Sequence, residues 1–210
     1  MYAESAFLLV AMPLVACLLC VEGRPRLIVA SLIAGMTACL LSAYVSASFA
    51  QMLGAPPDMA TVEISPFVEE VMKLLIPLFY LAVMLPKSDN INLCFIFVAV
   101  GFATMESAFY LLDAGAAEPG ILAMRGLSAA MMHLSCGLLM AFGFARVWQH
   151  SWLRIAGTVG LLSFAITYHA LYNLFIAAGG AAYYAAIIMP LATLLILLSA
   201  QRITGMLKAD

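Results

Sequence analysis

Six ionisable residues stand out because each of them interrupts a long apolar stretch of the sequence. They are Glu69, Glu70, Lys73, Glu106, His133 and His169. A charged side chain at the centre of a bilayer costs at least about 2.5 kcal/mol on insertion scales, so several such residues in apolar segments indicate function. Carboxylates and imidazoles can hold and activate a water for hydrolysis, and they can also carry protons across a membrane.

The spacing of these residues is consistent with helical pairs. Lys73 lies four residues after Glu69 and three after Glu70, so it can reach either carboxylate and offset its charge. The two glutamates are about 100° apart around a helix and therefore have different tasks. His169 and Asn173 are four residues apart on one face, which suits two hydrogen-bond donors aimed at a single oxygen.

Each of these residues also has a structural explanation when it is taken alone. Glu-Glu-x-x-Lys at the start of a helix is a favourable acidic first turn, because the helix dipole attracts negative charge there. A single histidine in a membrane span more often makes a hydrogen bond between helices than it takes part in catalysis. The whole set, in four successive apolar segments, favours a shared interior site.

The composition of the chain indicates which kind of structure must hold these six residues in place. Of the 210 residues, 66% are hydrophobic and 10% are charged, which a water-soluble domain could not bury. We expect an all-α, polytopic transmembrane bundle that forms a single domain over residues 1–210. Apolar runs predict seven spans near residues 5–21, 27–50, 66–85, 91–112, 121–145, 153–177 and 182–201.

Details of the span ends follow from local sequence signals. Ser65 and Pro66 predict an N-cap and first turn for the third span. Arg125, close to the end of its span, is expected to anchor the chain at the membrane interface.

The first 21 residues have no basic start, so they predict a retained span rather than a signal peptide. The five cysteines lie in apolar stretches, which argues against disulfides.

Basic residues predict how the bundle is oriented, with the N-terminus outside and the C-terminus in the cytoplasm. They gather on alternate connections, at Arg24, Arg26, Lys87, Arg146, Arg154, Arg202 and Lys208. The opposite connections carry Asp58, Glu63, Asp113 and Glu118. In this orientation the polar groups of the four central spans lie at one depth, roughly 6–12 Å below the outer surface.

Taken in order, four segments resemble the PrsW family of intramembrane proteases. They are Glu69-Glu70-Val-Met-Lys73, Gly101-Phe102-Ala103-Thr-Met-Glu106, His133 and His169-Ala-Leu-Tyr-Asn173. The paired glutamates and the His-x-x-x-Asn are also similar to the wider superfamily of CAAX prenyl proteases and bacteriocin-processing enzymes. One departure is Ser107, where the PrsW pattern usually has Asn.

The resemblance implies an enzyme of the bacterial inner membrane with a catalytic core at about residues 65–177. It would cleave a membrane-anchored, anti-sigma-factor-like protein near the outer face. In this interpretation Glu69 and His133 activate water, and His169 and Asn173 stabilise the oxyanion. Glu70, Lys73 and Glu106 orient that set. Whether Glu69 or Glu70 is the base stays open.

We expect a metal-free glutamate mechanism without a cofactor, and zinc is the alternative. The sequence lacks the His-Glu-x-x-His spacing of a zincin. If zinc binds, the candidate ligands are Glu69, Glu70, Glu106, His133 and His169.

Partners follow from composition and from the resemblance. The bilayer and a membrane-anchored substrate are the expected ones, whereas the dispersed charges give no reason to expect nucleic acid. Two other functions stay open, namely a proton- or cation-coupled transporter and a non-catalytic relative that binds a membrane peptide.

Overall fold

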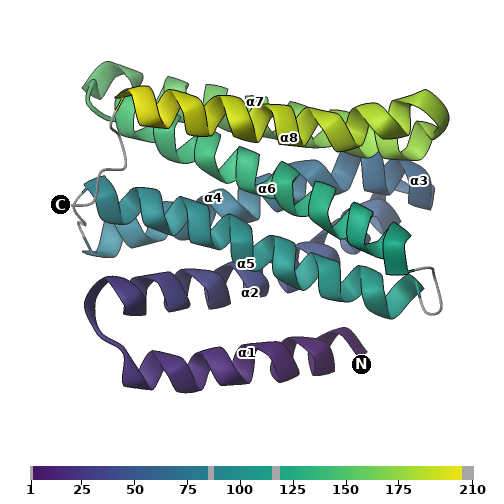
Figure 1. The fold of residues 1–210 in the computed structure, drawn as a ribbon, viewed down its shortest axis with the longest axis horizontal. Helices are drawn as coiled ribbons and strands as arrows, with labels where there is room; N and C mark the ends of the chain where they lie inside the picture. The colour runs from purple at the N-terminus through teal and green to yellow at the C-terminus, as the bar shows by residue number, and fades with distance from the viewer. Residues whose placement is uncertain (1, 85–87, 115–118, 205–210) are drawn as a thin grey trace.

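The computed structural model describes residues 2–84, 88–114 and 119–204 (Figure 1). Lys87, Glu118 and Lys208, which were used to predict the orientation, lie outside the described residues. The side chains of Asp113 and Arg202 are not described either. The orientation of the bundle is therefore still a prediction.

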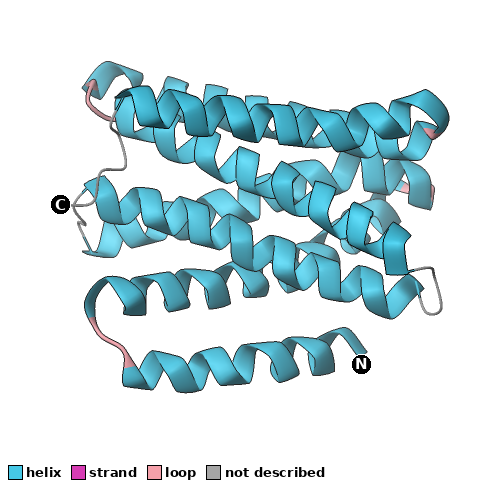
Figure 2. Ribbon diagram, in the orientation of Figure 1, coloured by secondary structure: helices cyan, strands magenta, loops and turns pink. Residues whose placement is uncertain are grey.

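Seven long helices make up the fold, and each contains most or all of one predicted span. They are α1 (Tyr2–Cys20), α2 (Gly23–Leu53), α4 (Ser65–Met84), α5 (Ser88–Ala114), α6 (Pro119–Val147), α7 (Arg154–Ala178) and α8 (Gly180–Thr204). Figure 2 shows that the described residues are almost entirely helical. The all-α prediction is confirmed.

Six of these helices are long and apolar enough to cross a membrane, counted over the described residues. They are α1, α2, α5, α6, α7 and α8. The exception, α4, has 20 residues but carries Glu69, Glu70 and Lys73 close together. The protein is therefore a multi-pass membrane protein, and the helix that looks least like a membrane span is the one that carries three of the six ionisable residues.

The long helices run alongside one another (Figure 1). Helix α1 packs on α2, α2 on α5, and α5 on α6, while α6 also contacts α7 and α8. Helix α4 contacts α2, α5 and α7. This position lets α4 share its polar side chains with helices from both halves of the chain.

The start of α4 differs from the sequence-based prediction. Ser65 has helical dihedral angles, φ −58° and ψ −47°, and it is not an N-cap. A short helix α3 (Pro57–Met59) and a π-helical turn η1 (Ala60–Ile64) lead directly into α4. Pro66 has no amide hydrogen to donate to the preceding turn, and the chain accommodates it with a widened π turn, as often occurs near functional sites.

Two glycines bring α2 and α5 into close contact. A Cβ atom on Gly35 would lie 2.1 Å from the carbonyl oxygen of Val98, and one on Gly101 would lie 2.1 Å from that of Leu32. Helices in membranes commonly use small residues in this way, because backbones that approach closely gain van der Waals contact. The contact also fixes the part of α5 that contains Glu106.

Gly101→Ala should therefore destabilise the fold. The new methyl group would meet backbone that cannot move away, so we expect a loss of about 1–3 kcal/mol in the free energy of unfolding. Gly160→Ala on α7 is the matched control, since a Cβ atom there meets nothing within 4 Å. It should be neutral or stabilising by up to about 1 kcal/mol. Unfolding in mixed detergent micelles would measure both, and equal losses would contradict the close packing.

Candidate active site

Four helices bring the ionisable residues into one buried cluster. Glu69, Glu70 and Lys73 come from α4, Glu106 from α5, His133 from α6 and His169 from α7. Glu70, Lys73, His133 and His169 are all buried. The convergence that was inferred from depth alone is thus present as direct contact between side chains.

Lys73 and Glu70 form the centre of the cluster. The Lys73 ammonium lies 2.6 Å from Glu70 Oε1 and 2.9 Å from His133 Nδ1. It also lies 4.5 Å from the centroid of the Phe102 ring, which covers it. Burying a charge is costly unless it is paired and hydrogen-bonded, and these contacts satisfy that condition for Lys73.

The contacts of His133 determine its tautomer. Because the ammonium of Lys73 donates to Nδ1, the proton of a neutral ring lies on Nε2. This Nε2 lies 2.6 Å from Glu106 Oε2, to which it donates. The imidazole therefore connects Lys73 to Glu106 across the cluster.

The hydrogen bond of His169 fixes the tautomer opposite to that of His133. Its Nδ1 lies 2.9 Å from Glu70 Oε1, so the ring donates from Nδ1 and its Nε2 keeps a lone pair. Nε2 lies 3.8 Å from Glu69 Oε2. A carboxylate that holds one nitrogen of a histidine and frees the other is typical of histidines that bind metals.

Glu69, His133 and His169 form a group that could hold a metal ion. One ligand atom from each residue lies within 4.8 Å of the others. Glu69 Oε2 is buried and has no hydrogen-bond partner, which is unfavourable unless another ligand occupies that place. Two imidazoles and one carboxylate are a known donor set of catalytic zinc.

The residues therefore fit a metal, with one requirement. Both nitrogens of His133 are occupied, by Lys73 and by Glu106, so one of these two contacts must open for His133 to act as a ligand. His169 and Glu69 need no such change.

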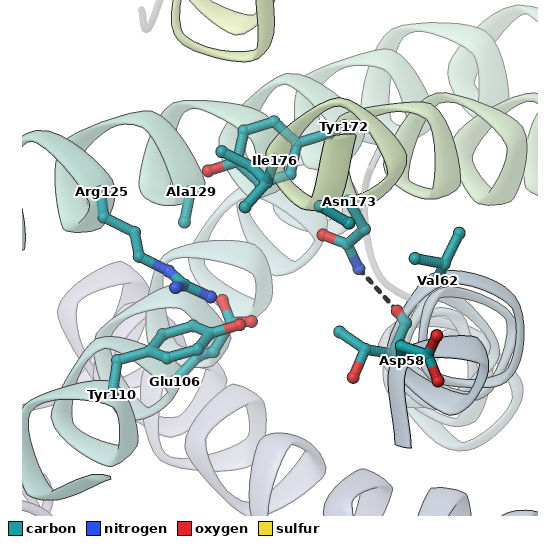
Figure 3. Close-up of a pocket in the computed structure, with 11 residues that line it drawn as sticks. Asp58, Val62, Glu106, Tyr110, Arg125, Ala129, Tyr172, Asn173 and Ile176 are labelled. Carbon is teal, nitrogen blue, oxygen red and sulfur yellow. Dashed lines mark hydrogen bonds between the residues drawn. The ribbon is translucent and has the colours of Figure 1, made fainter. Parts of the chain in front are cut away.

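A cavity of about 220 Å³ opens beside the cluster, between η1, α5, α6 and α7 (Figure 3). Glu106 reaches it with a side chain that is 17% exposed. On one side the Arg125 guanidinium lies 4.0 Å from the centroid of the Tyr110 ring. On the other side Asn173 Nδ2 donates to the carbonyl of Thr61 at 3.0 Å (Figure 3).

Two residues that line this cavity have surroundings that differ from the sequence-based prediction. Arg125, expected to be an interface anchor, has its guanidinium in the cavity (Figure 3). Asn173 lies on the cavity wall and is hydrogen-bonded to η1, whereas His169 is hydrogen-bonded to Glu70, so the two have different partners. Tyr110 was missed, although its position four residues after Glu106 places it on the same helix face.

A second cavity, of about 360 Å³, reaches the cluster from the side of α2. Glu69 and Glu106 both line it, and Glu106 lines the first cavity as well. The two carboxylates therefore have access to space that water can fill, while Glu70 and Lys73 do not border either of these two cavities.

Comparison with known proteins gives one family. Residues 23–198 match the model described as PrsW family intramembrane metalloprotease. This range includes all the residues of the cluster and both cavities. Neither the curated proteins nor the solved structures provide a significant match.

Removing the charge of Glu70 alone should destabilise the protein more than removing its partner Lys73 together with it. Glu70→Ala leaves Lys73 buried without its carboxylate, which should cost about 3–5 kcal/mol in unfolding free energy. Lys73→Met in the same chain removes the stranded charge, so the double variant should recover about half of that loss. Unfolding of the single and double variants in detergent micelles tests the pairing, and strictly additive losses would refute it.

Proposed function

Because the chain belongs to the PrsW family of intramembrane metalloproteases, we propose that it hydrolyses a peptide bond of a membrane-anchored protein at Glu69, His133 and His169. The observation that carries this proposal is the convergence of two imidazoles and an unpartnered carboxylate oxygen inside a multi-pass bundle. Family membership favours it over the transporter alternative.

Glu69, His133 and His169 would hold the metal, for which zinc is the best fit by donor type. When bound, zinc would polarise the peptide carbonyl and make a neighbouring water more acidic. The sequence-based preference for a metal-free mechanism is untested, and the metalloprotease family together with this donor set favours the alternative that sequence analysis had kept open.

Glu106 is the best candidate to accept the proton of the attacking water. Its Oε2 receives a hydrogen bond from His133, and its side chain borders both cavities, where water and substrate can enter. The water oxygen bonds to the carbonyl carbon, its proton passes to Glu106, and Glu106 returns that proton to the nitrogen as the C–N bond breaks. This assignment differs from the roles inferred from sequence, in which Glu69 or Glu70 was the base.

Glu70 and Lys73 would position the other groups. The Oε1 atom of Glu70 accepts from both Lys73 and His169, and the residue is buried and lines neither the first nor the second cavity. Its contact with Nδ1 keeps the Nε2 of His169 turned toward Glu69. Arg125 and Asn173, on the walls of the first cavity, are placed to donate to a substrate carbonyl.

The resemblance to the family suggests the substrate class, and the position of the cluster along the helices suggests the side of the membrane. Glu69 is close to the start of α4, and His169 is in the last half of α7, so the site is nearer to the membrane end formed by η1. With the N-terminus outside, that end faces outward. We infer cleavage of a membrane-anchored, anti-sigma-factor-like protein near the outer face of a bacterial inner membrane, by one domain with its catalytic core at about residues 65–177.

Zinc content and activity should separate the metal-holding residues from the proton acceptor. The purified wild type should carry about one zinc per chain, and Glu69→Gln or His169→Ala should lose it. Glu70→Gln should weaken zinc binding about 10- to 100-fold. Glu106→Gln should keep zinc but abolish cleavage. Metal analysis of each detergent-purified variant, with proteomics of new N-termini in cells, measures both properties.

Two outcomes would contradict this division. If Glu106→Gln also loses zinc, Glu106 is a ligand and cannot be the proton acceptor. If the wild type binds no zinc while cells expressing it still show a cleavage that Glu69→Gln abolishes, the metal-free mechanism is correct.

The orientation has its own test. Alkaline phosphatase is active only outside the cytoplasm, so its fusion after Gly179, which follows α7, should be active. A fusion after His150, which follows α6, should be inactive, and green fluorescent protein at the same two positions should give the opposite result. The reverse pattern would place the cluster near the cytoplasmic face and refute cleavage at the outer face.

A further inference from the structure

The second cavity is a groove whose wall on α2 consists of small residues. Ser42, Ala43, Ser46, Ala47 and Ala50 form that wall. Opposite them lie η1, the start of α4 and the aromatic rings of Phe102 and Phe109 on α5. Its volume of about 360 Å³ is within the range of ligand pockets, about 300–1,000 Å³. Glu69 and Glu106, which belong to the proposed site, also line it.

Two residues that line this groove each have a buried polar atom that makes no hydrogen bond within the described part of the chain. The Ser46 hydroxyl is buried, with 7% of the residue exposed, and it makes no hydrogen bond. Serines in helices usually bond back to a carbonyl one turn earlier, as Ser42 does to Cys39 and Ser48 does to Tyr44. Glu69 Oε2 is the second unpartnered atom. A buried polar atom without a partner costs stability, so both are best explained by a ligand.

The chemistry of the groove distinguishes between a lipid chain and a peptide. An acyl chain offers no hydrogen bonds and would leave Ser46 and Glu69 unsatisfied. An extended peptide has the opposite need, because its backbone N–H and C=O groups must find partners inside a membrane. The short side chains of α2 let a peptide backbone approach that helix closely, and the rings of Phe102 and Phe109 opposite limit the space for its side chains.

We propose that this groove binds an extended polypeptide segment with small side chains and directs it to Glu69 and Glu106. Ser46 hydrogen-bonds to the backbone of that segment, and the alanines of α2 select for small side chains. This inference rests on the proposed function and assigns its substrate path. The first cavity, which Glu106 also lines, would then receive the carbonyl to be attacked, beside Arg125 and Asn173.

Photo-cross-linking tests the location of the substrate independently of cleavage. The full chain carrying Glu106→Gln, with Ala47 unchanged, is irradiated in detergent with a probe that carries a small photoreactive diazirine, and mass spectrometry locates the labelled residues. The probe is a short labelled peptide of alanine, serine and valine. Ala30 is the matched control, because it is also exposed on α2 but does not line the groove.

We expect labelling at position 47 at least tenfold above that at position 30, and competition by the same unlabelled peptide. A peptide of equal length made of leucine and phenylalanine should compete poorly. Equal labelling at both positions, or none at position 47, overturns the groove. If position 47 is labelled but the wild type cleaves nothing, the groove stands and the proposed function fails. If the wild type cleaves the peptide without labelling at position 47, the proposed function stands and the groove is not the substrate path.

Filling the groove gives a second measurement. Ala47→Phe should lower kcat/KM for the alanine-rich peptide at least tenfold without changing zinc content, and Ala30→Phe should change neither. Ser46→Ala should raise KM about 3- to 10-fold with little effect on kcat, because it removes one hydrogen bond to bound substrate. An unchanged kcat/KM in Ala47→Phe would exclude the groove as the substrate path.

Discussion

A charge that is embedded in a membrane needs a partner within the protein. Glu70 is that partner for side chains on two helices, α4 and α7. Its Oε1 accepts from Lys73 on its own helix and from His169 on α7. Lys73 extends the network to His133 on α6, and His133 extends it to Glu106 on α5. Because the bilayer provides no competing hydrogen bonds, this network holds α4, α5, α6 and α7 in one register. The position of the candidate active site follows from it.

Helix packing supports the same arrangement from the apolar side. The close contact at Gly35 and Gly101 brings α5 against α2, and Phe102, the next residue after Gly101, lies over Lys73 and His133. The Phe102 ring thus separates the charged cluster from the apolar interior of the bundle. Glu106, one turn further along α5, remains at the edge of this covered region and reaches both cavities.

Sequence patterns predicted the helices well, because long apolar runs leave little choice in a bilayer. They also identified the four polar segments, since charges in such runs are rare. They did not predict the start of α4, because the π turn that accommodates Pro66 continues the helix through Ser65, so the capping signal of Ser65 is not used. The position of Arg125 also differed, because a tertiary contact decides it. Its distance from the helix end suggested snorkelling, but the ring of Tyr110 on a neighbouring helix draws its guanidinium into the cavity.

Hydrogen bonding separates the residues that hold the fold from those that remain available for chemistry. Glu70 and Lys73 have their partners inside the cluster, so they gain nothing from a ligand. Glu69 Oε2 and the Ser46 hydroxyl have none, and both line the same groove. Buried unsatisfied atoms cost stability, so a ligand bound at these two would offset that cost. Both belong to residues that line the cavity between α2 and Glu106, which is the path that we propose for the substrate.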